Sequence, residues 1–243
     1  MTKKKSKSDE NDNNEIINFY ELKKVKKFTK TGINPNYEKH GIKVPFRALL
    51  IGSSGVGKTN LLLNIINKMA VTFNHIYIYT KATEPLYDYL TSQLSTDLLT
   101  ISYDLDSLRK FDDDDYYGQS LVIFDDMVNE KNQQVISELY IRGRKIKGGI
   151  SLLYLTQSYF QVPKIIRIQC QYIFILKTGS NRDLKLIMSE YSLNTSPQQL
   201  IKIYNYCCNS GEFGSFMLID LVATQNKTFR KNFKEYLNLS DFP

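Results

Sequence analysis

Five residues between positions 52 and 59 have the types and the spacing needed to bind phosphate. Gly52, Gly55, Gly57, Lys58 and Thr59 match the pattern G-x-x-x-x-G-K-[ST] without a gap. Glycines let successive backbone N–H groups turn inward onto phosphate oxygens, a Lys reaches the β- and γ-phosphates, and a Thr hydroxyl suits Mg²⁺. The pattern therefore predicts a site for a nucleoside triphosphate with Mg²⁺. Its predicted binding residues are Gly52, Ser53, Ser54, Gly55, Val56, Gly57, Lys58, Thr59 and Asn60.

The sequence on either side of this loop predicts the strand and the helix that it must join. Residues 48–51 form a short apolar run, which is typical of a strand buried on both faces. Leu61, Leu62, Ile65 and Ile66 then recur at helical spacing. The alternative is a Gly/Ser turn with a chance Lys-Thr pair, and the flanking strand and helix argue against it.

Two acidic residues follow a second apolar strand, which we predict over residues 121–124. An apolar strand that ends in carboxylates is what the metal side of a phosphate-loop site requires, a pattern known as Walker B. We expect Asp125 to hold Mg²⁺, directly or through water, and Asp126 to polarise the attacking water. An Asp after a buried strand is common in α/β proteins, so the interpretation depends on the phosphate loop that precedes it.

A polar amide ends a third strand, predicted over residues 150–155. Ligands bind at the carboxyl ends of parallel strands, so Gln157 is placed to sense the γ-phosphate or to orient water. The alternative is that Gln157 is an ordinary polar residue of a loop.

The rest of the chain continues an alternation of strands and helices. We predict strands at 75–80, 98–103, 172–177 and 215–221, and helices at 84–94, 133–142, 183–191 and 197–206. Such alternation is typical of an α/β protein with a doubly wound, mostly parallel sheet, to which an antiparallel edge can be added. An acidic run at 112–115 is expected to be a solvated loop rather than a cation site.

Length and composition are compatible with one large domain. The chain has 243 residues, of which 42% are hydrophobic, enough for a substantial core. No apolar run approaches the roughly 20 residues of a membrane span, and the N-terminus lacks the apolar segment of a signal peptide. We therefore expect an intracellular protein that is not secreted. The three cysteines have no partner pattern and are expected to be buried thiols.

The net charge of +7 is unevenly distributed. Residues 1–45 hold eleven Lys against six acidic residues, so we predict a basic, partly disordered N-terminal arm at 1–43. The arm could contact nucleic acid or simply keep the protein soluble. The predicted phosphate-loop domain spans 44–222, and a basic and aromatic tail at 223–243 could bind DNA or a partner, or pack on the surface.

These motifs together carry a family resemblance. GSSGVGKT, LVIFDD and RGRKIKGG, the last running into ISLLYLTQS, follow one another at this spacing. The chain resembles the FtsK/HerA superfamily of P-loop motors, and especially the genome-packaging ATPases of poxviruses, giant viruses and virophages. The resemblance covers residues 44–222. The position of Asp126 is often Glu in the wider superfamily, and the Asp-Asp form resembles the viral packaging branch.

The resemblance implies a fold and a function. The strand that carries the sensor Gln157 should lie between the two Walker strands, and the protein should hydrolyse ATP with Mg²⁺. Subunits should form a homo-oligomeric ring, a pentamer or a hexamer, that drives double-stranded viral DNA into a preformed capsid through a capsid or portal component. The expected location is the viral factory in the host cytoplasm, or the virion.

The resemblance also implies an arginine finger, a residue that completes the site of the neighbouring subunit. Arg142 and Arg144 stand in the matching segment, and we favour Arg144 because Gly143 and Lys145 flank it as in the family. The alternative is that these side chains merely neutralise the C-terminal end of the helix at 133–142. Arg167 is a further candidate.

Four other classes of protein share the phosphate loop. A GTPase is disfavoured because no Asn-Lys-x-Asp motif occurs, and a small-molecule kinase because no Arg-rich lid is evident. A nucleotide-dependent scaffold without turnover is disfavoured by the intact catalytic residues. A related DNA motor for plasmid transfer, chromosome pumping or recombination fits the same residues.

Overall fold

A computed structural model describes residues 18–19, 22–26, 32–112, 118–131, 133–146, 149–191, 195–209, 211–224 and 227–243, without the side chains of 25, 26, 109, 110, 112 and 144. The chain divides into one unit of residues 1–31 and a second of residues 32–243. The first contains the short helix α1 (Lys23–Lys26). The predicted disorder of residues 1–15 lies outside the described residues, as does the acidic run at 112–115 apart from the backbone of Asp112.

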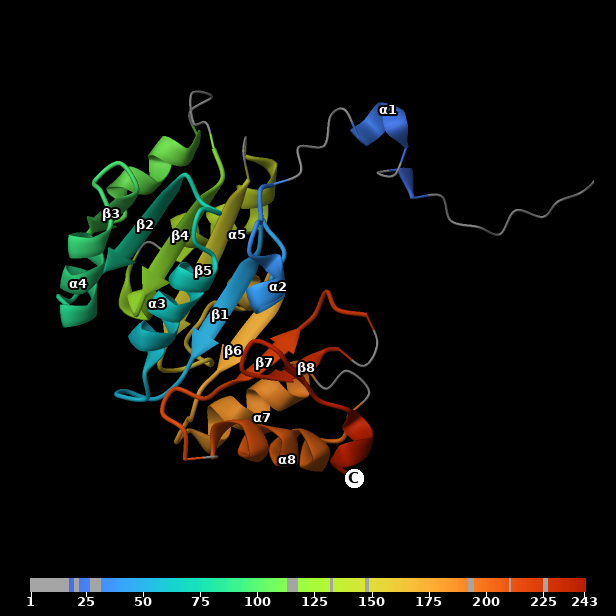
Figure 1. The fold of residues 1–243 in the computed structure, drawn as a ribbon. Helices are drawn as coiled ribbons and strands as arrows, with labels where there is room; N and C mark the ends of the chain where they lie inside the picture. Colours follow the sequence, from blue (N-terminus) through green and yellow to red (C-terminus); the bar gives the residue numbers. More distant parts are fainter. Residues whose placement is uncertain are drawn as a thin grey trace, which may run out of the picture. The chain divides into compact units, whose positions relative to one another are not determined.

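The second unit is organised around one large sheet, whose described strands run in the order β3-β2-β4-β5-β1-β6-β7-β8-β9 (Figure 1). The first six are parallel, and β7, β8 and β9 form an antiparallel edge. The predicted mostly parallel α/β sheet is confirmed, and the strand before Gln157 lies between the two Walker strands as expected. The strands are β1 (Arg47–Ile51), β2 (His75–Thr80), β3 (Leu99–Ser102), β4 (Ser120–Asp125), β5 (Ile150–Thr156), β6 (Tyr172–Ile175), β7 (Met217–Asp220), β8 (Phe229–Lys231) and β9 (Glu235–Tyr236).

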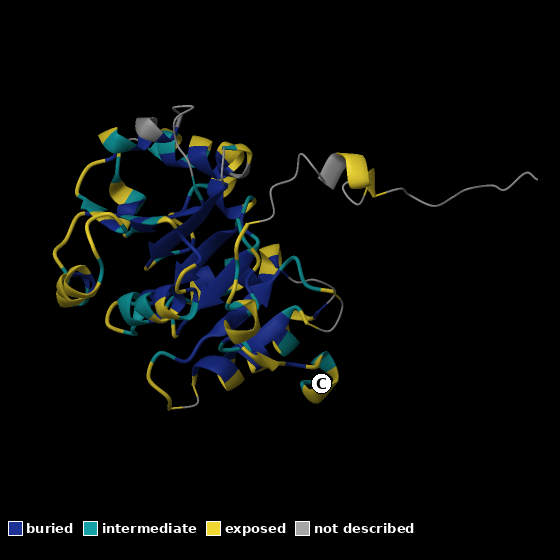
Figure 2. Ribbon diagram, turned by 45° about the horizontal axis from the view of Figure 1, so that its top comes forward, coloured by how far each residue is buried: buried dark blue, intermediate teal, exposed yellow. Residues whose placement is uncertain are grey.

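Helices cover both faces of the sheet. One hydrophobic cluster joins the sheet to α5, α7 and α8, and a second joins it to α3 and α4. Figure 2 shows the strands as the buried centre and the outer helix surfaces as exposed. The helices are α2 (Tyr37–His40), α3 (Lys58–Lys68), α4 (Pro85–Gln93), α5 (Gln133–Arg142), α6 (Lys164–Arg167), α7 (Asn181–Glu190) and α8 (Pro197–Cys208), with 3-10 turns η2 (Asp106–Asp112), η3 (Met127–Asn129), η4 (Gly143–Lys145) and η5 (Leu239–Asp241).

The central strand β1 shows why a strand buried on both faces carries a run of apolar residues, here 48–51. Leu49 and Ile51 belong to one hydrophobic cluster, whereas Ala48 and Leu50 belong to the other. Because successive side chains point to opposite faces, a strand covered on both faces needs an apolar residue at every position.

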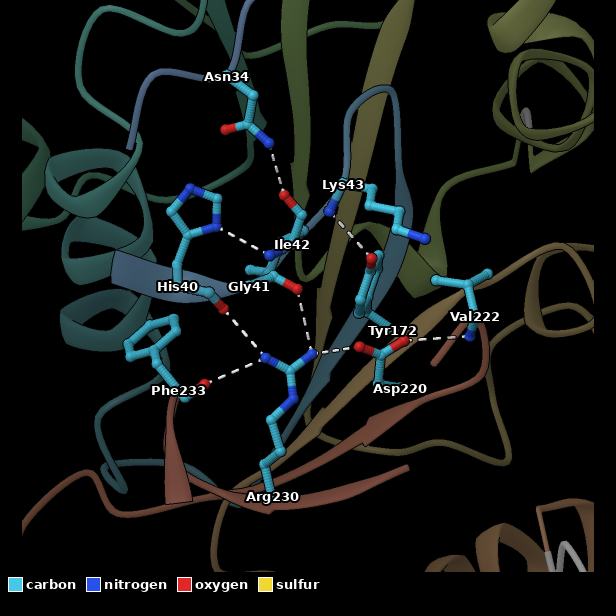
Figure 3. Close-up of polar contacts among 10 residues, drawn as sticks. All are labelled: Asn34, His40, Gly41, Ile42, Lys43, Tyr172, Asp220, Val222, Arg230 and Phe233. Carbon is cyan, nitrogen blue, oxygen red and sulfur yellow. Dashed lines mark hydrogen bonds and ion pairs between the residues drawn. The ribbon is translucent and has the colours of Figure 1, made fainter. Parts of the chain in front are cut away.

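The described residues on either side of the predicted domain belong to the same folded unit. Arg230 of β8 is fully buried, and its guanidinium donates to the carbonyls of His40 at 3.1 Å and Gly41 at 3.3 Å and pairs with Asp220 of β7 (Figure 3). We call this group the Arg230 clasp. The folded unit of residues 32–243 is therefore wider than the bounds 44–222 that the sequence predicted.

Candidate nucleotide-binding site

The loop between β1 and α3 has the backbone that the glycine pattern predicts. Gly55 and Gly57 have φ values of 75° and 97°, in the left-handed region that favours glycine. Position 52 has no room for a side chain, because a Cβ added to Gly52 would lie 2.8 Å from Cγ2 of Val56 and 3.0 Å from Cβ of Leu176. The three glycines therefore shape a tight turn directly before the first residue of α3.

Hydrogen bonds fix this loop to the ends of the two neighbouring strands. The N–H of Gly52 donates to the carbonyl of Thr156 at 3.2 Å, and the N–H of Ser53 donates to that of Lys177 at 3.1 Å. The hydroxyl of Ser53 accepts from the N–H of Gly179 at 2.9 Å. The loop is thus held between the carboxyl ends of β5 and β6, which is where ligands bind in parallel sheets.

Lys58 lies in the first turn of α3 with its ammonium at the loop. Nζ donates to the carbonyls of Gly52 and Ser53, both at 3.0 Å. Burial lowers the pKa of Lys58, and the carboxylates of Asp126 and Asp125 act in the opposite direction. The following residues, Thr59 and Asn60, are half-buried in the same turn of the helix.

Asp125 ends β4 and is paired with a tyrosine that the sequence analysis did not identify. The hydroxyl of Tyr87, on α4, donates to Oδ2 of Asp125 at 2.6 Å. Burial raises the pKa of Asp125 and the Tyr87 hydrogen bond lowers it, while burial and the Asp125 charge raise the pKa of Tyr87. The carboxylate is therefore desolvated and directed by a single strong donor. A Tyr within an amphipathic helix carries no sequence signal for such a contact.

Asp126 is brought together with the predicted sensor residue. Nε2 of Gln157 donates to Oδ2 of Asp126 at 2.8 Å, and the backbone N–H of Asp126 donates to the carbonyl of Leu155 at 3.1 Å. Asp126 has a φ of 54°, a left-handed conformation that is uncommon for a residue other than glycine and that turns the chain out of β4. Both side chains are exposed at the carboxyl edge of the sheet.

The predicted arginines lie far from this edge within one chain. Arg142 ends α5 and Arg144 lies in η4, close to the start of β5. The seven residues of β5 separate that end from the carboxyl edge, roughly 20 Å at about 3.3 Å a residue. Arg142 and Arg144 therefore cannot serve the site of their own chain, and a role in a neighbour's site stays a prediction.

Arg167, the further candidate, is engaged inside its own chain. It is largely buried, its guanidinium pairs with the carboxylate of Glu190 at 2.7 Å, and it lies 4.8 Å from the ring centroid of Tyr159. These contacts fix α6 against α7. They give Arg167 a packing role.

The fold and this edge define a class of protein. A glycine loop with its Lys after β1, an acidic pair after β4, and a polar amide after the strand between them are the parts of a P-loop NTPase site. Residues 36–228 match the family described as poxvirus A32 protein, and the chain belongs to that family.

Individual proteins of similar sequence are named DNA packaging proteins. The DNA packaging protein OPG160 of Variola virus is 28% identical over 135 residues, which cover 50% of this chain and 49% of that protein. Its counterpart in Vaccinia virus (strain Copenhagen) has the same identity and coverage. The chain thus spans about half the length of the curated relatives that it matches.

Solved structures support the fold. The genome packaging NTPase B204 from Sulfolobus turreted icosahedral virus 2, in complex with sulfate, has a TM-score of 0.56 and 18% identity over 81% of this chain and 100% of that chain. B204, the DNA-packaging ATPase from Sulfolobus turreted icosahedral virus, has a TM-score of 0.57 and 16% identity over 82% and 98%. The pCW3 conjugation coupling protein TcpA has a TM-score of 0.52 and 12% identity over 81% and 62%. Among the residues that the structure describes, no helix has the length and apolar character needed to cross a membrane.

Proposed function

We propose that this protein is an ATP-hydrolysing motor that moves double-stranded viral DNA into a preformed capsid. The observation that carries the proposal is the pairing of Gln157 with Asp126 beside an intact phosphate loop, in a chain of the poxvirus A32 protein family. Relatives of similar sequence are named DNA packaging proteins, and the B204 protein of similar fold is named a genome packaging NTPase. B204 has also been determined with ATP-gammaS and AMPPCP, which supports ATP as the ligand of this fold.

Each residue of the site has a role in hydrolysis. The loop N–H groups and Lys58 offset the negative charge that develops on the β- and γ-phosphate oxygens. Asp126 accepts a proton from the attacking water while the bond between the γ-phosphorus and the β-γ bridging oxygen breaks, which gives ADP and phosphate. Gln157 donates a hydrogen bond to Asp126 and so orients that carboxylate and the water.

The donor set fits Mg²⁺. The hydroxyl of Thr59 and the carboxylate of Asp125 are hard oxygen donors of the kind that Mg²⁺ prefers. Burial raises the pKa of Asp125, and a bound cation would offset the cost of keeping that carboxylate charged. When bound, the ion would neutralise phosphate charge, and Thr59 and Asp125 are the residues that would hold it.

The assembly is part of the same proposal. Subunits form a pentameric or hexameric ring on a capsid or portal component, in the viral factory or the virion. Arg144, or Arg142, reaches the site of the neighbouring subunit. DNA is held through its phosphates by the basic residues of the N-terminal arm and by Lys145 and Lys147. The likeness to the conjugation coupling protein TcpA keeps a second function open, a DNA motor for plasmid transfer.

The first test measures ATP hydrolysis with and without duplex DNA across a salt series. DNA should stimulate ATP hydrolysis by the wild-type protein, and Lys58→Ala should be folded but inactive.

For DNA binding, each phosphate contact adds about −0.9 to the slope of log K against log salt. DNA affinity should therefore fall steeply with salt and change little with sequence, and addition of procapsids should distinguish packaging from plasmid transfer. ATP hydrolysis by Lys58→Ala would reject the assignment of the nucleotide site. A DNA affinity that does not change with salt and depends strongly on sequence would reject binding through the DNA phosphates.

The second test concerns the arginine. The Arg144→Ala variant, which has an intact phosphate loop, is mixed with the Lys58→Ala variant, which has an intact Arg144. Activity should reappear in mixed rings although neither variant is active alone, because a finger supplied in trans typically contributes about 10³ to 10⁵ in rate. Inactive mixtures in which native mass spectrometry detects mixed oligomers would reject Arg144 as the finger. The same experiment with Arg142→Ala separates the two candidates.

A further inference from the structure

A cavity of about 250 Å³ lies between α3 and the segment 212–216, beside the phosphate loop. Asn60, Leu61 and Asn64 of α3 line it on one side, and Phe213 and Gly214 of the segment 212–216 line it on the other. None of these residues belongs to the hydrolytic group formed by Asp125, Asp126 and Gln157. The cavity begins where the phosphate loop passes into the helix.

The most unusual residue of this cavity is Phe213. Its side chain is 75% exposed, although it lies against the loop: a Cβ added to Gly57 would be 3.1 Å from Cζ of Phe213 and 3.4 Å from Cε1. Gly214, with a φ of 74°, brings the backbone of the same segment close to α3, since a Cβ there would be 3.6 Å from Nδ2 of Asn60. A large aromatic ring is thus held at the rim of the loop without being covered by the rest of the described chain.

The sheet order decides which part of a nucleotide would reach this ring. The strands run β4-β5-β1-β6-β7, so Asp125 and Gln157 follow strands on one side of the phosphate loop and the segment of Phe213 leads into β7 on the other side. The γ-phosphate must face the acidic pair for hydrolysis. The α-phosphate therefore lies toward the start of α3, and the ribose and base leave the loop on the β6–β7 side, beside Phe213.

The chemistry of the cavity fits a purine base. A base offers two flat faces for stacking and an edge of hydrogen-bonding groups, and an aromatic side chain stacks with it independently of that edge. Asn60 provides an amide on the facing wall, 3.6 Å from the Cβ position at Gly214. We propose that Phe213 is the base platform of this enzyme, stacking on the adenine of ATP with the Asn60 amide at the edge of the base. This inference rests on the proposed ATPase function.

The experiment compares ATP with inorganic tripolyphosphate, which has the phosphates but no base. Binding of each to full-length protein with Mg²⁺ is measured by titration calorimetry for wild type, Phe213→Ala, Phe213→Trp and the control Tyr89→Ala, an exposed aromatic on α4. Phe213→Ala should weaken ATP binding by about 5- to 150-fold, the range expected for one base–aromatic stack, and leave tripolyphosphate binding unchanged. Phe213→Trp should retain ATP affinity. Steady-state assays should give a raised KM for Phe213→Ala with kcat largely kept.

Three outcomes would overturn the base platform. ATP binding equal in wild type and Phe213→Ala would show that the ring does not touch the base, while the nucleotide site itself would stand. Equal losses of ATP and tripolyphosphate would make Phe213 a support of the loop. A change of oligomeric state in Phe213→Ala at unchanged ATP affinity would assign the ring to contact between subunits. The proposed function fails separately, if wild-type protein binds neither ligand.

Discussion

Replacement of Tyr87 by Phe tests whether the hydroxyl on α4 prepares Asp125 for metal. The side chain of Tyr87 is only 3% exposed, and its oxygen lies 2.6 Å from Oδ2 of Asp125, the length of a strong charge-assisted hydrogen bond. Hydrogen bonds to charged groups contribute about 1.5–3 kcal/mol. Because the Phe variant keeps the ring and removes the donor, the change isolates that contribution.

The expected loss follows from this range. About 1.5–3 kcal/mol corresponds to a 10- to 150-fold change, close to the 10- to 100-fold that loss of an outer-sphere partner typically costs in metal affinity. The Mg²⁺ concentration for half-maximal ATPase activity should rise by that factor in Tyr87→Phe. The hydrogen bond lowers the pKa of Asp125, so its removal should also shift the acidic limb of the pH–rate profile to higher pH.

The assay is a Mg²⁺ titration of ATP hydrolysis at several pH values, with circular dichroism to verify folding. Tyr89→Phe, on the exposed side of the same helix, is the matched control and should behave as wild type. If Tyr87→Phe needs the same Mg²⁺ or less, the tyrosine competes with the ion for Asp125 instead of preparing it, and the reasoning is refuted.

Three further predictions concern other residues of the structure. Gln157→Ala should lower single-turnover hydrolysis by about 10-fold or more and leave ATP affinity unchanged, because Asp126 loses its positioning donor but not its charge; an equal loss of binding would contradict this. Arg230→Met should lower the free energy of unfolding in urea by about 3–5 kcal/mol, because it leaves a buried carboxylate unpaired, and adding Asp220→Asn should recover part of the loss. Burial, with the charges of Arg230 and of a lysine on α3, lowers the pKa of His40 to about 4. Since this value lies below the 6.5 of the unfolded chain, stability should fall as pH drops from 6.5 toward 4, by up to about 3 kcal/mol, and a variant with His40→Asn should show a flatter pH dependence of urea unfolding.

Local patterns in the sequence predicted much of this fold. The phosphate loop, the strand before it and the helix after it are contiguous, so a glycine pattern and an apolar period are sufficient to find them. The place of β5 between β4 and β1, in contrast, came from the family resemblance, since nothing local to residues 150–156 fixes which strands they adjoin. That order brings Gln157 within hydrogen-bond distance of Asp126 in the structure, a contact that the sequence analysis did not predict.

Contacts between distant positions escaped prediction. Tyr87 and Asp125 are 38 positions apart, and Arg230 and His40 are 190 positions apart, so no period or motif links the members of either pair. Phe213 stood in a loop without any pattern. The strand β8, of only three residues, is too short for alternation to be recognised, so the sequence alone places the start of the tail at 223.

The Arg230 clasp has a consequence for the order of events during synthesis. The carbonyls of His40 and Gly41 receive their buried donor only after residue 230 has been added and has left the ribosome. At the usual 5–20 residues a second, translation of the intervening 190 positions takes on the order of 10 to 40 s. The segment 34–43 therefore cannot complete its contacts until translation is nearly finished, and apolar residues that are buried in the folded protein, such as Ile42, are accessible to chaperones during that interval.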